Sequence, residues 1–169
     1  MDKIQKARSI SIWIFIIPFL AVNICLLLFN EFHWIFPNQE DIIHNAFPYF
    51  DGQASISRTV RPYPSWLIFK PAMFLTSFLL VKYWLFNKEI VQHFKGNHKY
   101  VKKFVFFGIA SAIALVFHSI FLGIKFDYNL YKLFRRVIML SFIVFEITAQ
   151  AYLVTVSYTH LTLPTKRIV

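Results

Sequence analysis

Four long apolar stretches, separated by shorter polar and charged segments, form the main pattern of this chain. They cover residues 10–29, 66–86, 104–124 and 137–155. A helix needs about 20 mainly apolar residues to cross the hydrocarbon core of a bilayer. Each stretch therefore predicts a membrane-spanning helix. Together they predict an all-α fold, a polytopic transmembrane helical bundle with four spans.

The composition narrows the class of protein further. Hydrophobic residues make up 57% of the chain and charged residues 15%, against about 25% charged residues in soluble domains. So few charges cannot cover this much apolar surface in water, and the chain is too hydrophobic to be disordered. The single cysteine, Cys25, excludes a disulfide-stapled secreted domain. We expect a multi-pass integral membrane protein whose residues 1–155 form one transmembrane domain.

The residues near the ends of the stretches are typical of a membrane interface. Lys70 and Lys82 lie near the two ends of the second stretch, where long side chains can reach the lipid headgroups. Aromatic side chains are expected to form belts at the same level. These are Trp34 and Phe36 after the first stretch, Trp66, Tyr83 and Trp84 on the second, and Tyr128 and Tyr131 before the fourth.

The charge distribution predicts an orientation. The net charge of +10 favours contact with anionic lipid headgroups, and we expect no nucleic-acid partner. Basic residues gather before the first stretch and in residues 88–103, which places both segments in the cytoplasm. The loop 30–65 holds two arginines against four acidic residues and is expected outside, although a basic third loop at 125–136 opposes this pattern. We predict the plasma (inner) membrane of a bacterium, with the N-terminus cytoplasmic.

The last residues differ in character from the rest. The segment from Val156 to Thr165 resembles the translation of a transposase-adapter DNA used in sequencing libraries. A polar extension of the fourth helix is the alternative. We expect residues 156–169 to be a non-native tail, which would make the chain a C-terminally truncated fragment from an uncultured, shotgun-sequenced source.

The loop before the second stretch carries a candidate headgroup site. Its hydroxyl and guanidinium groups are those of Ser57, Arg58, Thr59 and Arg61, in a segment that could form a short extended piece or a re-entrant edge. An arginine fork can bind two phosphate oxygens, and hydroxyls can add hydrogen bonds. A solvated turn with interface anchors is the alternative.

The fourth stretch contains an acidic residue near its middle. Glu146 lies one helical turn before Gln150, on the same helix face. A charged, unpaired carboxylate inside a membrane costs a few kcal/mol or more. Lys70 and His118 are its expected partners in this chain. The pattern leaves two alternatives open, namely an ion, proton or headgroup site and a structural hydrogen bond between helices.

The third stretch carries small residues at helical spacing. Gly108 precedes Ala112 by four residues, as Ala110 precedes Ala114 and Ser119 precedes Gly123. Such faces allow two helices to approach closely, so we predict helix packing there. His118 on the same stretch is expected to form an interhelical hydrogen bond, with a ligand or proton-relay role as the alternative.

The sequence carries no motif for chemistry that we could identify. No glycine-rich phosphate loop, HExxH, CxxC or GxSxG is present. His93 and His98 are five residues apart among lysines, which is poor spacing for zinc ligands. We therefore assign no catalytic residue, no metal site and no cofactor.

The loop also resembles a known family. Pro48-Tyr49, the segment Ile56–Thr59, a following proline and Ile68-Phe69 at the start of a helix are similar to the first external loop of the DRAM/Sfk family. Arg58 and Val60 depart from its acidic residue and glycine. The resemblance implies a non-catalytic, lipid-associated protein with six helices, and it supplies no catalytic residues.

These observations predict a non-enzymatic, lipid-associated integral membrane protein that works through its first external loop. The alternatives are a proton- or ion-coupled small-molecule transporter that uses the intramembrane glutamate, and a membrane-embedded enzyme. The expected partners are membrane lipids, with other membrane proteins or a second copy of the chain as further candidates.

Overall fold

The computed structural model describes residues 2–37, 56–95, 100–124 and 128–158, and within these ranges it contains helices and no strands. The elements are α1 (Asp2–Glu31), the 3₁₀ helix η1 (His33–Ile35), α2 (Ile56–Thr59), α3 (Ser65–Lys95), α4 (Val101–Phe121) and α5 (Asn129–Tyr158). Four of these helices are long and apolar enough to cross a membrane. The predicted all-α bundle is confirmed, and its four long helices are compatible with an integral membrane protein.

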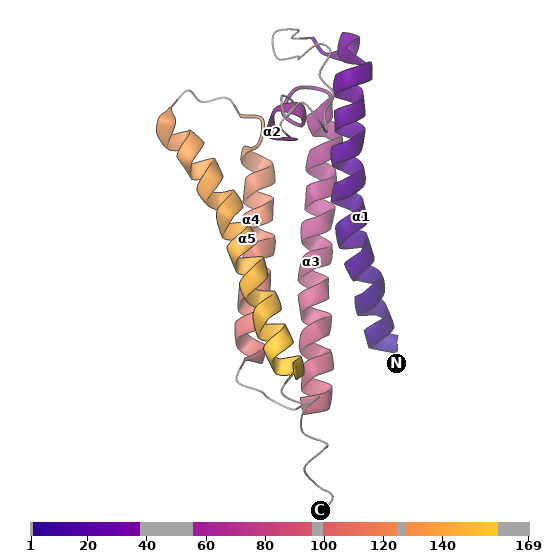
Figure 1. The fold of residues 1–169 in the computed structure, drawn as a ribbon, viewed down its shortest axis with the longest axis vertical. Helices are drawn as coiled ribbons and strands as arrows, with labels where there is room; N and C mark the ends of the chain where they lie inside the picture. The colour runs from indigo at the N-terminus through magenta and orange to yellow at the C-terminus, as the bar shows by residue number, and fades with distance from the viewer. Residues whose placement is uncertain (1, 38–55, 96–99, 125–127, 159–169) are drawn as a thin grey trace, which may run out of the picture.

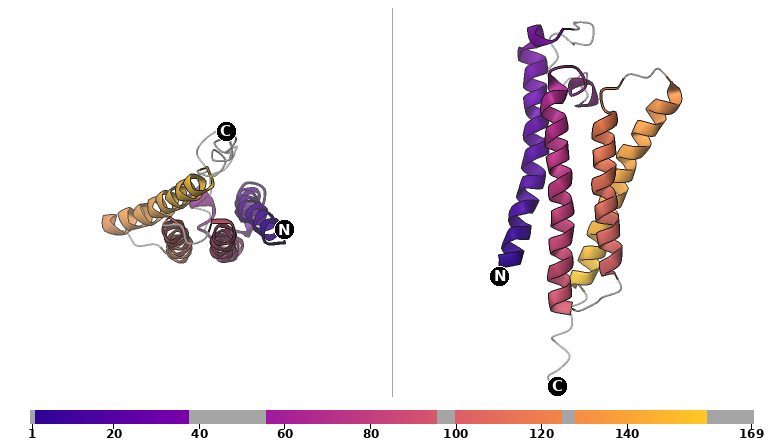
Figure 2. Two further views of the ribbon diagram at one scale, coloured as in Figure 1. Left: turned by 90° about the horizontal axis from the view of Figure 1, so that it is seen from below. Right: turned by 180° about the vertical axis from the view of Figure 1, so that it is seen from behind.

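The long helices form an up-and-down bundle. Helix α1 packs on α3, α3 packs on α4, and α4 packs on α5. The first three stand side by side, whereas α5 crosses the bundle obliquely with its Asn129 end leaning outwards (Figures 1 and 2). The short helix α2 lies against α1 at the end of the bundle where α3 begins. No extensive contact joins α1 to α5 in the described part of the chain.

The helices extend beyond the apolar stretches that predict them. Helix α3 has 31 residues, a length of about 46 Å, so Lys82 lies well inside it. Helix α4 ends at Phe121 because Gly123 adopts a left-handed φ of 96° just beyond its end. Helix α5 begins at Asn129, so the assignment of Lys132, Arg135 and Arg136 to a loop is wrong, and they lie in the first turns of α5.

The predicted boundary at residue 156 does not coincide with a helix end. Helix α5 continues through Val156 to Tyr158, and the Val156 side chain is buried. The rest of the predicted tail, residues 159–169, lies outside the described residues, as do residues 38–55 of the external loop.

The predicted packing face on α4 is confirmed at its contact with α3. Gly108 and Ala112 are buried, and a Cβ atom at position 108 would overlap the indole ring of Trp84. Nearby, the Ser77 hydroxyl donates a hydrogen bond of 2.8 Å to the Ala112 carbonyl oxygen. The glycine therefore provides the space that the buried Trp84 ring of α3 occupies.

Burial in the structure corrects the assignment of two aromatic residues. Trp84 has an exposed fraction of 0% and Phe36 one of 2%, so neither belongs to an interfacial belt. Trp34 and Tyr128, by contrast, are 70% and 74% exposed, as belt residues should be. Trp84 was misplaced because α3 extends nine residues beyond the predicted end at Phe86 and so includes it in the interior.

A methyl group at position 108 should weaken the contact between α3 and α4. We expect Gly108→Ala to lower the free energy of unfolding by about 1–3 kcal/mol, the usual cost of overpacking a filled interior. Thermal unfolding in detergent, followed by circular dichroism, measures the effect. Ala151→Val on the exposed face of α5 is the matched control. Equal stability of Gly108→Ala and the wild type would contradict the packing.

Candidate functional site

The carboxylate of Glu146 is the centre of a hydrogen-bond network that joins three helices. Its Oε2 accepts a bond of 2.7 Å from the Ser111 hydroxyl on α4 and one of 3.3 Å from the Trp84 indole N–H on α3. Its Oε1 accepts a bond of 3.0 Å from the Gln150 amide on α5. Glu146 and Gln150 lie on one face of α5, as their spacing in the sequence predicts.

All three partners of the carboxylate are uncharged donors. Glu146 makes no salt bridge with any described residue. The Ser111 hydroxyl is also 2.8 Å from the Gly108 carbonyl oxygen, so its one proton is shared between two acceptors. The network solvates the carboxylate, but it supplies no compensating positive charge.

The network lies at the middle of the bundle. Ser111 is the central residue of the 21-residue helix α4, and ten residues on either side correspond to about 15 Å. The hydrocarbon core of a bilayer is about 30 Å thick. If α4 spans a membrane, Glu146 therefore lies near the midplane, where a carboxylate is most costly.

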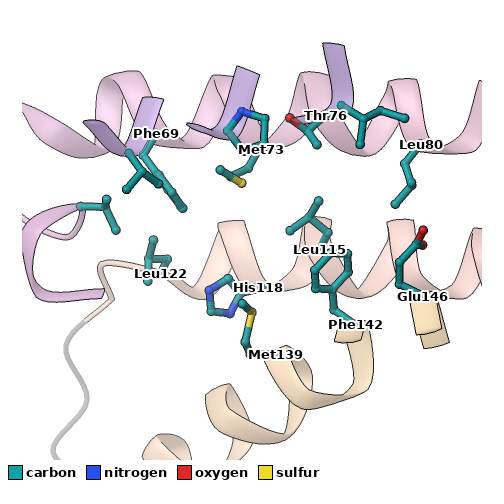
Figure 3. A pocket seen from close by; sticks show the side chains of 14 residues that line it. Phe69, Met73, Thr76, Leu80, Leu115, His118, Leu122, Met139, Phe142 and Glu146 are labelled. Atoms are coloured by element: carbon teal, nitrogen blue, oxygen red, sulfur yellow. The ribbon is translucent and has the colours of Figure 1, made fainter. Parts of the chain in front are cut away.

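A cavity of about 470 Å³ opens beside Glu146. Its walls come from all four long helices and from Val60, just after α2, and most of its lining is apolar (Figure 3). Phe69, Met73 and Leu80 of α3 face Leu115 of α4 and Phe142 of α5 across it. The cavity lies between α5, which leans away from the row of helices, and the helices α1, α3 and α4 (Figures 1 and 2).

Three polar side chains contribute to the cavity wall. They are Glu146 near one end, Thr76 on α3 and His118 on α4. The Thr76 hydroxyl donates to the Ala72 carbonyl of its own helix at 2.8 Å. His118 is half-buried, and its Nδ1 has no hydrogen-bond partner among the described residues. The expected interhelical hydrogen bond of His118 through this nitrogen is therefore not formed.

The structure does not bring Lys70 to the glutamate. The ammonium group of Lys70 lies 5.2 Å from the centre of the Trp66 ring, close to the start of α3. Such a contact over an aromatic face is a cation–π interaction. Among the two expected partners of Glu146, His118 shares its cavity and Lys70 does not.

The candidate headgroup cluster is split in the structure. Residues 56–59 form the helix α2, which corrects the expected extended piece. Arg58 is exposed and Arg61 is half-buried, but Thr59 has an exposed fraction of 0%. The Thr59 hydroxyl is therefore not presented at the surface beside Arg58. The side chain of Ser57 lies outside the described part.

Sequence reasoning did not identify Ser111 and Trp84 as partners of the glutamate. A hydroxyl within the small-residue face of α4 was the available signal for Ser111, since a polar group there faces another helix. No local signal distinguished Trp84 from an interfacial tryptophan. Within the described residues, no group of three or more His, Cys, Asp or Glu side chains could hold a metal ion.

Comparisons with known proteins add no assignment. No family model matches this chain, and neither a curated protein nor a solved structure is similar to it. The resemblance of the loop to the DRAM/Sfk family therefore stays a prediction, and the site must be interpreted from its own geometry.

Loss of the Ser111 hydroxyl should destabilise the bundle through the carboxylate. We expect Ser111→Ala to cost about 1.5–3 kcal/mol of unfolding free energy, the range for hydrogen bonds to charged groups. Ser119→Ala is the matched control, because Ser119 is equally buried on α4 and, among the described residues, bonds only to the Leu115 carbonyl of its own helix. Denaturant titration in micelles measures both. Equal losses in the two variants would contradict a special role for the Glu146 network.

Proposed function

We propose that this protein is a non-enzymatic integral membrane protein that binds an amphipathic molecule, with membrane lipids as the expected ligand class, in the cavity between its helices. The single observation that carries this proposal is the cavity of about 470 Å³ lined by all four long helices. Ligand pockets typically enclose about 300–1,000 Å³ and have mostly apolar walls with a few polar groups. This cavity has that size and that composition.

The surroundings of the cavity support entry from the lipid phase. Helices α1 and α5 both line it, yet no extensive contact between them closes that side in the described part of the chain. The packed core beneath α2 contains Val60 together with Phe69, Met73 and Leu122, which also line the cavity. An apolar chain placed there would exchange lipid contacts for protein contacts on several sides.

The first external loop contributes a phosphate-binding arginine to the proposed lipid site. Exposed Arg58 lies two residues before Val60, which lines the cavity. A guanidinium at this place could bind the phosphate of a lipid whose chain occupies the cavity. We place this end of the bundle outside and the N-terminus in the cytoplasm, in keeping with the basic residues near the opposite end.

Filling the cavity should weaken ligand binding. We expect Thr76→Phe to weaken the binding of decanol by at least about tenfold, because the ring would occupy the space that the ligand needs. Thr148→Phe is the matched control, since Thr148 also bonds its own helix, at Val144, but does not line the cavity.

Binding is measured in phosphatidylcholine nanodiscs from the fluorescence of Trp84, in a chain whose other three tryptophans are replaced by phenylalanine. Binding through the cavity gives a saturable signal that Thr76→Phe removes. A signal that rises linearly with decanol, or that both variants retain, reflects partition into lipid and would overturn the proposal.

A coupled carrier is the second candidate function. It is favoured by one specific observation, the carboxylate of Glu146 on the cavity wall without a salt-bridge partner among the described residues. Ionisable groups in such positions are typical of proton and ion pathways.

The carrier predicts that Glu146→Gln slows proton entry into proteoliposomes driven by a potassium diffusion potential, because the amide cannot take up and release a proton. Entrapped pyranine reports the internal pH, and protein-free liposomes give the background rate. Equal rates above the protein-free background in the variant and the wild type would exclude a proton path through Glu146.

A further inference from the structure

The acidic group on the cavity wall indicates the charge of the ligand. Among the described residues that line the cavity, Glu146 is the only one with an acidic side chain. We propose that the cavity takes a lipophilic ammonium ion, whose charged nitrogen lies against Glu146 and whose apolar body extends toward Val60. This inference rests on the proposed function, because it assumes that the cavity is a binding site, and it adds the chemical class of the ligand.

The carboxylate has capacity for a further donor. An ionised carboxylate can accept about four hydrogen bonds. Glu146 accepts two at Oε2 and one at Oε1 from the described residues, which leaves a position on Oε1. An ammonium group at that position would add both a hydrogen bond and the positive charge that the three neutral donors lack. Ionised partners make shorter and stronger bonds than neutral ones.

Three lysines of α1 and α3 are engaged elsewhere. The Lys70 ammonium lies over Trp66, and the Lys82 ammonium lies 4.6 Å from the centre of the Phe78 ring. Lys3 pairs with Glu89 at 2.8 Å near the end of the bundle. No described lysine or arginine forms a salt bridge with Glu146, so the compensating charge is left for a ligand to supply.

Helix α1 offers a second candidate acceptor. Pro18 has no N–H, so it cannot donate to the carbonyl oxygen of Ile14 one turn earlier in α1. Both residues line the cavity.

The register of the helices places this carbonyl at the level of the glutamate. Helices α1 and α3 are antiparallel, with Lys3 bound to Glu89 and Cys25 bound to Ser65. Ile14 is midway between Lys3 and Cys25 along α1, and Ser77 is midway between Ser65 and Glu89 along α3. Ile14 and Ser77 therefore lie at about the same level of the bundle. Ser77 bonds to Ala112, which follows the Ser111 partner of Glu146. An ammonium group between α1 and α5 could therefore meet acceptors on both sides.

The remaining length of the cavity fits an apolar body. From Ser111 to Leu122, which also lines the cavity, α4 rises about 16 Å. The walls along this distance are apolar side chains of all four long helices and of Val60, with Thr76 and His118 as polar exceptions. A primary amine with an alkyl chain of moderate length would place its charge at Glu146 and its chain against these residues.

The test compares three ligands that differ only in their polar group. Decylammonium, decanol and decanoate are titrated at neutral pH into nanodiscs of zwitterionic phosphatidylcholine that contain the protein. The reporter is Trp84, which donates to Glu146 and is fully buried, with the other tryptophans replaced by phenylalanine. We expect decylammonium to bind at least about tenfold more tightly than decanol, and decanoate to bind most weakly, because its charge is repelled by Glu146.

Substitution of the glutamate separates this inference from the proposed function. Glu146→Gln should remove the preference for decylammonium, so that the ratio of decylammonium to decanol affinity falls to about one, and Glu146→Asp should keep the preference in weaker form. Equal binding of decylammonium and decanol by the wild type would overturn the cation inference, while the cavity would still stand as a binding site. Absence of saturable binding by all three ligands would overturn both.

The proline on α1 gives an independent test of the second acceptor. Pro18→Ala restores an N–H that can bond to the Ile14 carbonyl, so we expect it to weaken decylammonium binding more than decanol binding. Pro71→Ala is the matched control, because Pro71 lies within α3, is exposed and does not line the cavity. The same loss in both proline variants, or no selective loss in Pro18→Ala, would overturn the role of the carbonyl.

Discussion

The structure depends on one constraint, the need to surround a carboxylate with hydrogen-bond donors at the middle of an apolar bundle. Glu146 meets this need with donors from three different helices, so its position fixes how α5 lies against α3 and α4. In a membrane, apolar contacts between helices are only weakly preferred over contacts with lipid, because lipid tails are as apolar as the side chains. The hydrogen bonds of the carboxylate therefore supply a register that van der Waals contacts would leave less sharply defined.

The packing of α3 on α4 serves the same constraint. Gly108 lets the Trp84 ring approach the backbone of α4, and this approach brings the indole N–H to Glu146 at 3.3 Å. Ser77 adds a polar contact between α3 and α4, because its hydroxyl donates to the Ala112 carbonyl oxygen. The small-residue face of α4 thus does more than save space, since it carries the donor Ser111 and admits the donor Trp84.

The cavity follows from what the network leaves unfilled. Helix α5 is held at Glu146 but leans outwards at its Asn129 end, so α1 and α5 line a common space without closing it (Figures 2 and 3). The cavity has a carboxylate near one end and apolar walls along the rest, so it suits a ligand with one polar group and an apolar body. The proposed lipophilic ammonium ion answers both features, whereas a purely apolar ligand would leave the carboxylate without a counter-charge.

The sequence by itself determined the class of fold and the residue of greatest interest. Four apolar stretches of spanning length predicted the four long helices, because hydrophobic length is a local property of the chain. Glu146 was recognisable because a carboxylate is rare in such a stretch, and Gln150 because four residues make one helical turn. Only the tertiary structure decided the partners Trp84 and Ser111, the buried position of Thr59 and the cavity itself. These depend on how helices distant in sequence align and tilt, and a pattern along one chain does not contain that relative placement.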